Sequence, residues 1–104
     1  MNRFNIIYAV QTKEHLKAID RKYYSLIRKM IEEQLQYEPD IGTINRKPLK
    51  RKGVFGSEWE IRFGTDNRFR VFYDVDKEHN EVRILAIGEK YGNRLFIGGE
   101  ETDS

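Results

Sequence analysis

Two consecutive segments of the chain alternate between apolar and polar residues, with Phe72 as the one exception, which is the pattern of half-buried β-strands. They span residues 58–63 and 68–75, and the turn-forming residues Gly64-Thr65-Asp66-Asn67 lie between them. Because neighbouring side chains on a strand point to opposite faces, the pattern predicts a hairpin with one apolar and one charged face. The apolar set is Trp59, Ile61, Phe63, Phe69, Val71, Tyr73 and Val75, and the charged set is Glu60, Arg62, Arg68 and Arg70.

The first third of the chain changes from strand to helical spacing. Phe4, Ile6 and Tyr8 alternate with Arg3, Asn5 and Ile7 and predict a short first strand. From Thr12, the predicted N-cap, apolar residues recur every three or four positions as far as Tyr37. Asp20-Arg21 divides this stretch into two predicted helices, and Pro39 ends the helical region because proline disfavours helix at the preceding residue.

The remaining segments predict further strands. Residues 41–57 form a long basic connection, residues 76–80 a turn, and residues 82–87 a strand that we expect Gly88 to interrupt. Residues 94–97 predict a short final strand. The order β-α-α-β-β-β-(β) predicts an α+β fold, in which two N-terminal helices pack on one face of an antiparallel sheet. Residues 1–104 are expected to form a single domain.

The distribution of charge is more informative than the net charge of +2. Residues 46–70 carry eight basic against three acidic side chains, whereas residues 71–104 carry four basic against eight acidic ones. The chain has no cysteine, which excludes disulfides and thiolate metal sites and fits a reducing cytosol. It also lacks an apolar run approaching the roughly 20 residues of a membrane span. We therefore expect a cytoplasmic protein with no cofactor, no metal site and no membrane association.

An excess of cations is predicted on the face of the sheet that the helices leave open. Its expected floor consists of Glu60, Arg62, Arg68, Arg70, Phe72 and Arg83, with Glu89, Lys90 and Arg94 at the rim. Pairing of Glu60 with Arg70 across strands would stabilise the sheet, but the arginines outnumber their partners. Crowded positive charge destabilises a fold through self-repulsion, which favours an anion-binding site. The basic loop 46–52 points to the same ligand, although lysine-rich loops are often only solvated.

These residues resemble the RelE/ParE superfamily of toxins from type II toxin–antitoxin systems. The resemblance covers nearly the whole chain and is carried by the segments 45–49, 59–63, 68–75 and 84–90. It implies a RelE-like endoribonuclease that cleaves ribosome-bound mRNA, inhibits translation, and is held inactive by a cognate antitoxin. It further implies that operator DNA is contacted only through the antitoxin.

The resemblance assigns roles to particular residues. Arg70 matches the arginine that contacts the scissile phosphate, Arg62 a basic residue on the preceding strand, and Lys90 the basic residue beyond the last long strand. Two positions depart from the family pattern. Phe96 stands at or near the usual Tyr or His and cannot transfer a proton, and Glu60 stands where several members have lysine.

The chemistry of RNA cleavage gives the remaining candidates. Glu60 is either a general base or the partner of an arginine. No residue stands out as the acid, for which Lys90 and Tyr91 are the two candidates. Phe72 either stacks on a base or packs in a core. Neither His15 nor His79 is assigned to catalysis. The residues expected to contact RNA are Arg46, Lys47, Lys50, Arg51, Lys52, Arg68, Phe72 and Arg83.

Two other functions remain open at this stage. ParE-like members inhibit DNA gyrase by protein binding, and the substitution at Phe96 favours that alternative. A catalytically silent module that only binds an antitoxin is the third possibility, because fold alone does not fix function.

Overall fold

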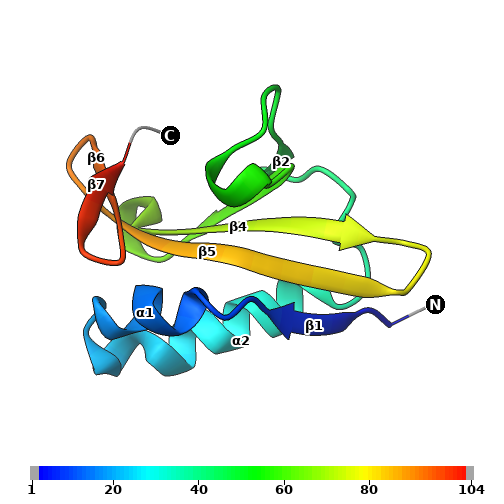
Figure 1. Cartoon of the computed structure of the whole chain (residues 1–104), viewed down its shortest axis with the longest axis horizontal. Coiled ribbons are helices and arrows are strands. Elements are labelled where there is room, and N and C mark those ends of the chain that lie inside the picture. Colours follow the sequence, from blue (N-terminus) through cyan, green and yellow to red (C-terminus); the bar gives the residue numbers. More distant parts are fainter. Residues whose placement is uncertain (1–2, 103–104) are drawn as a thin grey trace.

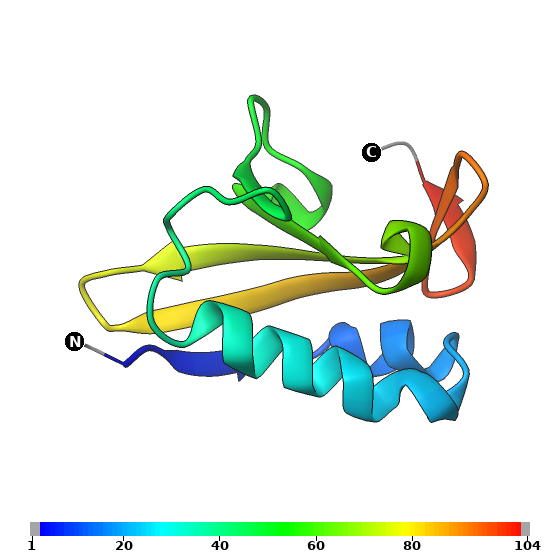
Figure 2. The same cartoon turned by 180° about the vertical axis from the view of Figure 1, so that it is seen from behind.

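A computed structural model describes residues 3–102, which form two helices and one sheet (Figures 1 and 2). The helices α1 and α2 lie on one side of the sheet, here called the helix face, and the loop after β2 stands on the opposite side, the open face. The elements are β1 (Asn5–Tyr8), α1 (Thr12–Lys17), η1 (Arg21–Tyr23), α2 (Tyr24–Leu35), β2 (Arg46–Pro48), η2 (Val54–Gly56), β3 (Trp59–Phe63), η3 (Thr65–Asn67), β4 (Phe69–Asp76), β5 (Glu81–Tyr91), β6 (Arg94–Ile97) and β7 (Glu100–Thr102).

The sheet confirms the predicted α+β architecture. Its strands follow the order β2-β3-β4-β5-β6-β7, and every neighbouring pair in this series is antiparallel. The first strand differs from the antiparallel expectation, because β1 pairs with the first half of β5 in parallel. Both β1 and β6 lie along the same edge of β5, one at residues 81–84 and the other at residues 88–91.

Helix α1 fills the gap between β1 and β6 along that edge of β5. The side-chain amide of Gln11 donates to the Leu85 carbonyl at 3.0 Å. The Ile87 N–H donates to Nδ1 of His15 at 3.3 Å. Unpaired backbone groups at a buried edge are costly, so these two side chains replace the missing strand partner.

The main core lies between α2 and the helix face. Ile27, Ile31 and Leu35 recur every four residues along α2, and they are at most 2% exposed. They pack in one cluster with sheet residues such as Val71 and Ile84. The buried Tyr73 hydroxyl donates to the Pro39 carbonyl at 2.7 Å and ties the segment after α2 to this core.

The predicted break between the helices is confirmed, but the predicted N-cap is wrong. The Asp20 carboxylate accepts the Lys22 N–H at 3.0 Å and starts η1. Thr12 is the first residue of α1, and its hydroxyl donates backwards to the Ala9 carbonyl at 2.7 Å. It therefore does not cap the amides of the first helical turn.

Gly88 does not interrupt the strand as expected, because β5 continues to Tyr91. A Cβ atom at residue 88 would lie 3.0 Å from side-chain atoms of both Leu95 and Ile97. Glycine at this position therefore allows β6 to pack closely against β5. Neither β2 nor β7 was predicted as a strand, and both are only three residues long.

A second, smaller core covers part of the open face. A register shift between Phe72 and Tyr73, opposite Leu85, places Ala86 on the same face as Phe72. These two residues and Leu95 are at most 3% exposed, and Leu49, Val54 and Ile97 pack around them. Phe72 is therefore not available to stack on a base, which corrects its assignment to RNA binding in favour of core packing.

Candidate functional site

Two arginines and one glutamate meet at the centre of the open face. Arg62 on β3 lies directly opposite Arg70 on β4 in the strand register, so both side chains leave the same face. The Glu60 carboxylate accepts a hydrogen bond from Nε of Arg62 at 2.5 Å. Its other oxygen lies 4.0 Å from Nη1 of Arg70. One carboxylate is thus shared by two guanidinium groups, and the group of three retains positive charge.

Arg70 is the most constrained member of this group. It is 5% exposed, and its Nε has no hydrogen-bond partner. Burial and the nearby Arg62 lower the pKa of Arg70, against the opposing effect of Glu60. A buried donor without an acceptor costs about 1–3 kcal/mol. The site therefore suits an anionic ligand that supplies both an acceptor and a negative charge.

Two lysines share the face with this group. Lys47 on β2 lies directly opposite Glu60 in the register. Lys90 on β5 comes two residues after Gly88, which is the partner of Arg70, and its backbone N–H donates to the Arg68 carbonyl at 2.7 Å. Four cationic side chains therefore flank one carboxylate on this part of the sheet.

Arg46, predicted to contact RNA, lies on the wrong face and is buried. It stands opposite Ile61 and is 6% exposed. Its Nε donates to the Ile41 carbonyl at 2.8 Å, and its Nη1 donates to the Gln34 carbonyl. The guanidinium thus satisfies carbonyls at and after the end of α2, and it is not available to a phosphate.

Arg68 also lies away from the open face. It precedes β4 and has a helical backbone conformation, so the alternation of the strand does not extend to it. Its guanidinium lies 4.5 Å from the ring centre of Tyr23 and 2.5 Å from the Glu89 carboxylate. The prediction that it joins Arg62 and Arg70 is therefore wrong.

Arg83 lies at the far end of the open face, beyond Phe72 and Ala86. It pairs with Asp76 at 2.9 Å and with Glu81 at 3.2 Å, so its charge is already balanced. By contrast, the side chains at the tip of the basic loop are exposed. They are Lys50, Arg51 and Lys52.

The candidates for proton transfer are few. Glu60 is 3% exposed and bonded to Arg62, as in the ion-pair alternative. Tyr91 lies opposite Arg94 and follows the alternation of Phe69 and Glu89 onto the helix face, away from Arg70. Phe96 pairs with Glu89 and has the same orientation. Within residues 3–102, neither a tyrosine nor a histidine stands beside the two arginines on the open face.

One group of possible metal ligands was not anticipated from the sequence. Ligand atoms of Asp76, Glu78 and His79 lie within 4.8 Å of one another in the turn between β4 and β5. Asp76 already pairs with His79 at 2.8 Å and with Arg83 at 2.9 Å. The guanidinium beside it opposes binding of a cation, and the group lies far along the sheet from Arg70.

Comparison with known proteins identifies the family. Residues 6–90 match the family described as ParE toxin of type II toxin–antitoxin system, parDE. The chain belongs to this toxin family. It is also similar in fold to the crystal structure of the toxin–antitoxin complex RelBE2 from Mycobacterium tuberculosis, with a TM-score of 0.68 and 22% sequence identity. That match covers 85% of this chain and 99% of the other. No curated protein matches the sequence at a significant level.

The family assignment confirms the resemblance to RelE/ParE toxins that the sequence indicated. In the part of the toxin that the structure describes, no helix has the length and apolar character needed to cross a membrane.

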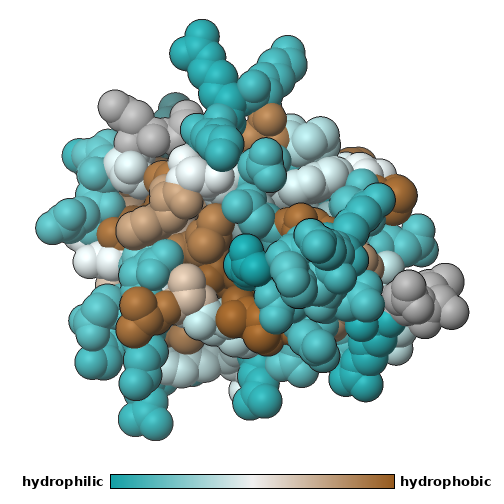
Figure 3. Space-filling view, turned by 45° about the vertical axis from the view of Figure 1, so that its right-hand side comes forward, coloured by the Kyte–Doolittle hydropathy of each residue, from teal (hydrophilic) through white to brown (hydrophobic). Residues whose placement is uncertain are grey.

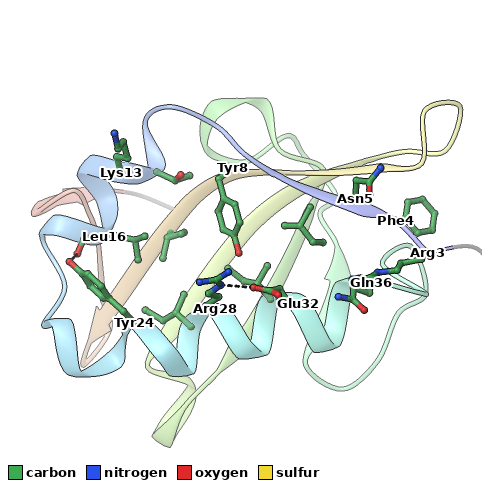
Figure 4. Close-up of a pocket in the computed structure, with 15 residues that line it drawn as sticks. Arg3, Phe4, Asn5, Tyr8, Lys13, Leu16, Tyr24, Arg28, Glu32 and Gln36 are labelled. Carbon is green, nitrogen blue, oxygen red and sulfur yellow. Dashed lines mark hydrogen bonds and ion pairs between the residues drawn. The ribbon is translucent and has the colours of Figure 1, made fainter.

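A groove that the sequence did not reveal runs between β1 and the helices of the toxin (Figure 4). Its volume is about 630 Å³, and its lining is mostly apolar, with residues such as Phe4, Ile6, Leu16 and Ile31. The Tyr8 ring points into it toward the Arg28–Glu32 ion pair, whose atoms are 2.8 Å apart. Burial, with a smaller contribution from Glu32, raises the pKa of Tyr8.

Several large apolar side chains are exposed near this groove. β1 pairs only with β5 among the described strands, so its outer edge has no strand partner. Ile7, Tyr8 and Val10 are 43%, 40% and 82% exposed. Figure 3 shows patches of hydrophobic surface between hydrophilic side chains on the side of the molecule turned toward the viewer. Only the three-dimensional packing of β1 against β5 brings these features together.

Proposed function

We propose that this toxin is a metal-independent endoribonuclease that binds a phosphate of ribosome-bound mRNA at Arg62 and Arg70. The observation that supports this proposal is the sharing of one carboxylate by two facing arginines, one of which has a buried Nε without an acceptor. A phosphodiester would provide that acceptor and offset the excess positive charge.

The chemistry follows from where charge develops during cleavage. The 2′-hydroxyl loses a proton and attacks the phosphorus, a pentacoordinate dianionic species forms, and the departing 5′-oxygen gains a proton. Preorganised cations aimed at the phosphate oxygens stabilise this species. Arg62 is more exposed than Arg70 and contacts the phosphate first. Arg70 then contacts the same phosphate from the buried side of the site.

Glu60 has a positioning role in this proposal. Glu60 is 3% exposed and is bonded to Arg62, so its carboxylate has a fixed position. From that position it keeps both guanidinium groups on one side of the sheet. Lys90 is then the candidate acid for the leaving oxygen, because its strand position places it on the face that carries Arg70. Lys47 and the loop tip at residues 50–52 contribute further phosphate contacts along the message.

The test is pulsed expression followed by mapping of new 5′ ends in cellular mRNA. We expect 5′ ends to accumulate within translated regions for the wild type and to fall by about 10²-fold or more for Arg70→Ala, the range for loss of one charge-stabilising donor. Arg83→Ala is the matched control, because this arginine lies on the same sheet but is already paired. Equal cleavage by the Arg70 variant would refute the proposal.

Inhibition of DNA gyrase is the second candidate. It is favoured by the absence of a tyrosine or histidine beside Arg70 in the described structure and by the burial of Phe72. This alternative predicts loss of DNA supercoiling in the same pulsed-expression experiment, with intact messages.

A cognate antitoxin is the proposed protein partner, and the groove beside β1 is its proposed site. The open edge of β1 offers main-chain hydrogen bonds to an added strand, and the apolar lining accepts alternate side chains. Arg3, Lys13 and Arg28 outnumber Glu32 around the groove, which favours an acidic segment. We expect Leu16→Glu to reduce neutralisation by the antitoxin, measured as growth on co-expression, whereas the exposed Lys17→Glu has little effect.

A further inference from the structure

A row of cationic groups and aromatic rings in contact with one another lies at the end of the sheet, outside the site just described. Arg68 lies 4.5 Å from the ring centre of Tyr23 and 5.7 Å from that of Tyr91. Tyr91 meets Phe96 edge to face, with 5.7 Å between ring centres, and Arg94 lies 5.8 Å from Phe96. Lys22 continues the row at 5.2 Å from Tyr23. We call these residues the cation–aromatic row.

Four separate segments build this row, and a buried carboxylate fixes its centre. Its members come from η1, the residue before β4, the end of β5, and β6. Glu89, only 3% exposed, holds Arg68 at 2.5 Å. A hydrogen bond to the same carboxylate raises the pKa of Tyr91, so the phenol stays neutral and tethered. The row is therefore preorganised.

Stability alone is a weak reason for this arrangement. Tyr91 is 52% exposed, and the side chain of Arg94 is 66% exposed. Arg94 pairs with the exposed Glu101 carboxylate at 2.7 Å, so a phosphate at Arg94 has to displace that carboxylate, and exposed ion pairs of this kind are weak. Exposed contacts between a cation and a ring contribute only about 0.5–1 kcal/mol each. A half-exposed ring flanked by arginines matches the platforms on which single-stranded nucleic acids stack their bases.

The row lies next to the candidate cleavage site along β5, but on the opposite face of the sheet. Tyr91 directly follows Lys90 on β5, and successive side chains of a strand point to opposite faces. Lys90 therefore faces the site of Arg70 while Tyr91 faces the row. A chain of nucleotides that leaves the cleavage site past Lys90 and turns over the end of the sheet reaches Tyr91 next.

We propose that the cation–aromatic row binds the single-stranded RNA flanking the cleaved linkage, with a base stacked on Tyr91 and a phosphate at Arg94. This inference rests on the proposed function, because the RNA-cleaving site supplies the class of ligand. A pair of adjoining rings with an arginine at each end suits a polymer that carries both bases and phosphates.

The test is fluorescence anisotropy with the purified full-length toxin and a labelled, unstructured 2′-O-methyl oligoribonucleotide of about 12 nucleotides. This probe lacks the 2′-hydroxyl nucleophile, so it is bound without being cleaved. We expect Tyr91→Ala to weaken binding by about 5- to 150-fold, the equivalent of one lost base stack. Tyr91→Phe should retain binding, because the ring face remains.

Salt dependence separates stacking from ionic contacts. Tyr91→Ala should leave the slope of log affinity against log salt unchanged, whereas Arg94→Gln should reduce its magnitude by about 0.7, the value for one phosphate contact on a single strand. Tyr37→Ala is the matched control, because Tyr37 is a 47% exposed tyrosine in the segment after α2. Thermal unfolding of each variant shows whether its fold is intact.

The outcomes distinguish this inference from the proposed function. If folded Tyr91→Ala binds the probe as tightly as the wild type while Arg70→Ala abolishes mRNA cleavage, the row is structural and the inference is wrong, but the nuclease proposal stands. If the wild-type toxin fails to bind the probe, the inference is wrong, whereas the nuclease proposal is still decided by the mapping of mRNA 5′ ends for Arg70→Ala.

Discussion

The two faces of the sheet differ in the side chains that they carry and in how those side chains are stabilised. On the helix face, α2 covers an apolar layer in which residues such as Ile31 and Ile84 are fully buried. On the open face, a small apolar cluster around Phe72 lies next to charged side chains whose positive groups exceed their partners. Stability is thus concentrated on one face, which leaves the other free to hold an arrangement that is electrostatically unfavourable without a ligand.

Two buried arginines illustrate the difference. Arg46 belongs to the helix face, and its guanidinium donates to two backbone carbonyls. Arg70 belongs to the open face, and its Nε has no partner. Nearly equal burial therefore accompanies a completed set of hydrogen bonds in one case and an incomplete one in the other. Burial by itself does not distinguish a structural arginine from a binding one.

The largest effect on stability is expected from the helix face. Ile84→Ala removes a fully buried side chain at the centre of the main core, and such truncations cost about 2–5 kcal/mol. Urea unfolding measures the change in the free energy of unfolding. Ile44→Ala is the control, because Ile44 is 99% exposed, and it should change stability by less than about 0.5 kcal/mol.

A smaller effect on the free energy of unfolding is expected when Arg46 and Arg70 are replaced one at a time, and it should differ between them. Arg46→Met leaves the Ile41 and Gln34 carbonyls without their donor, which costs about 1–3 kcal/mol. Arg70→Met removes a buried charge while Glu60 keeps Arg62, so it should be neutral or stabilising. Urea unfolding of the two variants side by side tests the comparison, and a clear destabilisation by Arg70→Met contradicts it.

The third effect is a dependence of stability on pH. Burial lowers the pKa of His15 below its ordinary value of 6.5, so below that pH the unfolded chain binds a proton that the folded chain does not. Stability should therefore fall as the pH drops from about 7 to 5, because a protonated ring cannot accept the Ile87 N–H. Urea midpoints across this range should fall less steeply for His15→Gln, with His79→Gln as the control. An unchanged slope in the His15 variant contradicts the assignment.

The smallest effect on stability is expected at the tip of the basic loop. The side chains of Lys50, Arg51 and Lys52 are exposed, and Lys52 has a coulombic interaction with Asp74. Replacing the three together by glutamine should therefore change the free energy of unfolding by no more than about 0.5 kcal/mol. RNA binding should respond instead, with the magnitude of the salt slope reduced by about 2 for three lost phosphate contacts. Unchanged salt dependence would place the RNA elsewhere.

The fold was largely predictable because its long elements carry clear periodicity. The strands 59–63 and 69–76 and the helices on either side of Asp20 follow directly from the spacing of apolar residues. The predictions that were wrong concern features that depend on tertiary packing. A register shift beside Phe72 and the cover supplied by Leu49 turned an expected RNA contact into core, and neither leaves a local signal.

The candidate site was only partly predictable for a similar reason. Arg62 and Arg70 meet as expected, because both lie within regular strands where alternation holds. Arg68 precedes its strand by one residue, and Arg46 belongs to a three-residue strand whose pairing partner the sequence did not identify. The groove beside β1 was missed because it depends on the pairing of strands more than 70 residues apart.

The pairing of β1 with β5 sets the order in which the molecule can assemble. Residues 5–8 have no strand partner until residues 81–84 exist, so the first strand to leave the ribosome is among the last to be fixed in place. Contacts of such long range slow folding, because the intervening chain must be closed before they form. The tertiary structure of this toxin can therefore close only after residues 81–84 have been synthesised and are free to pair with residues 5–8.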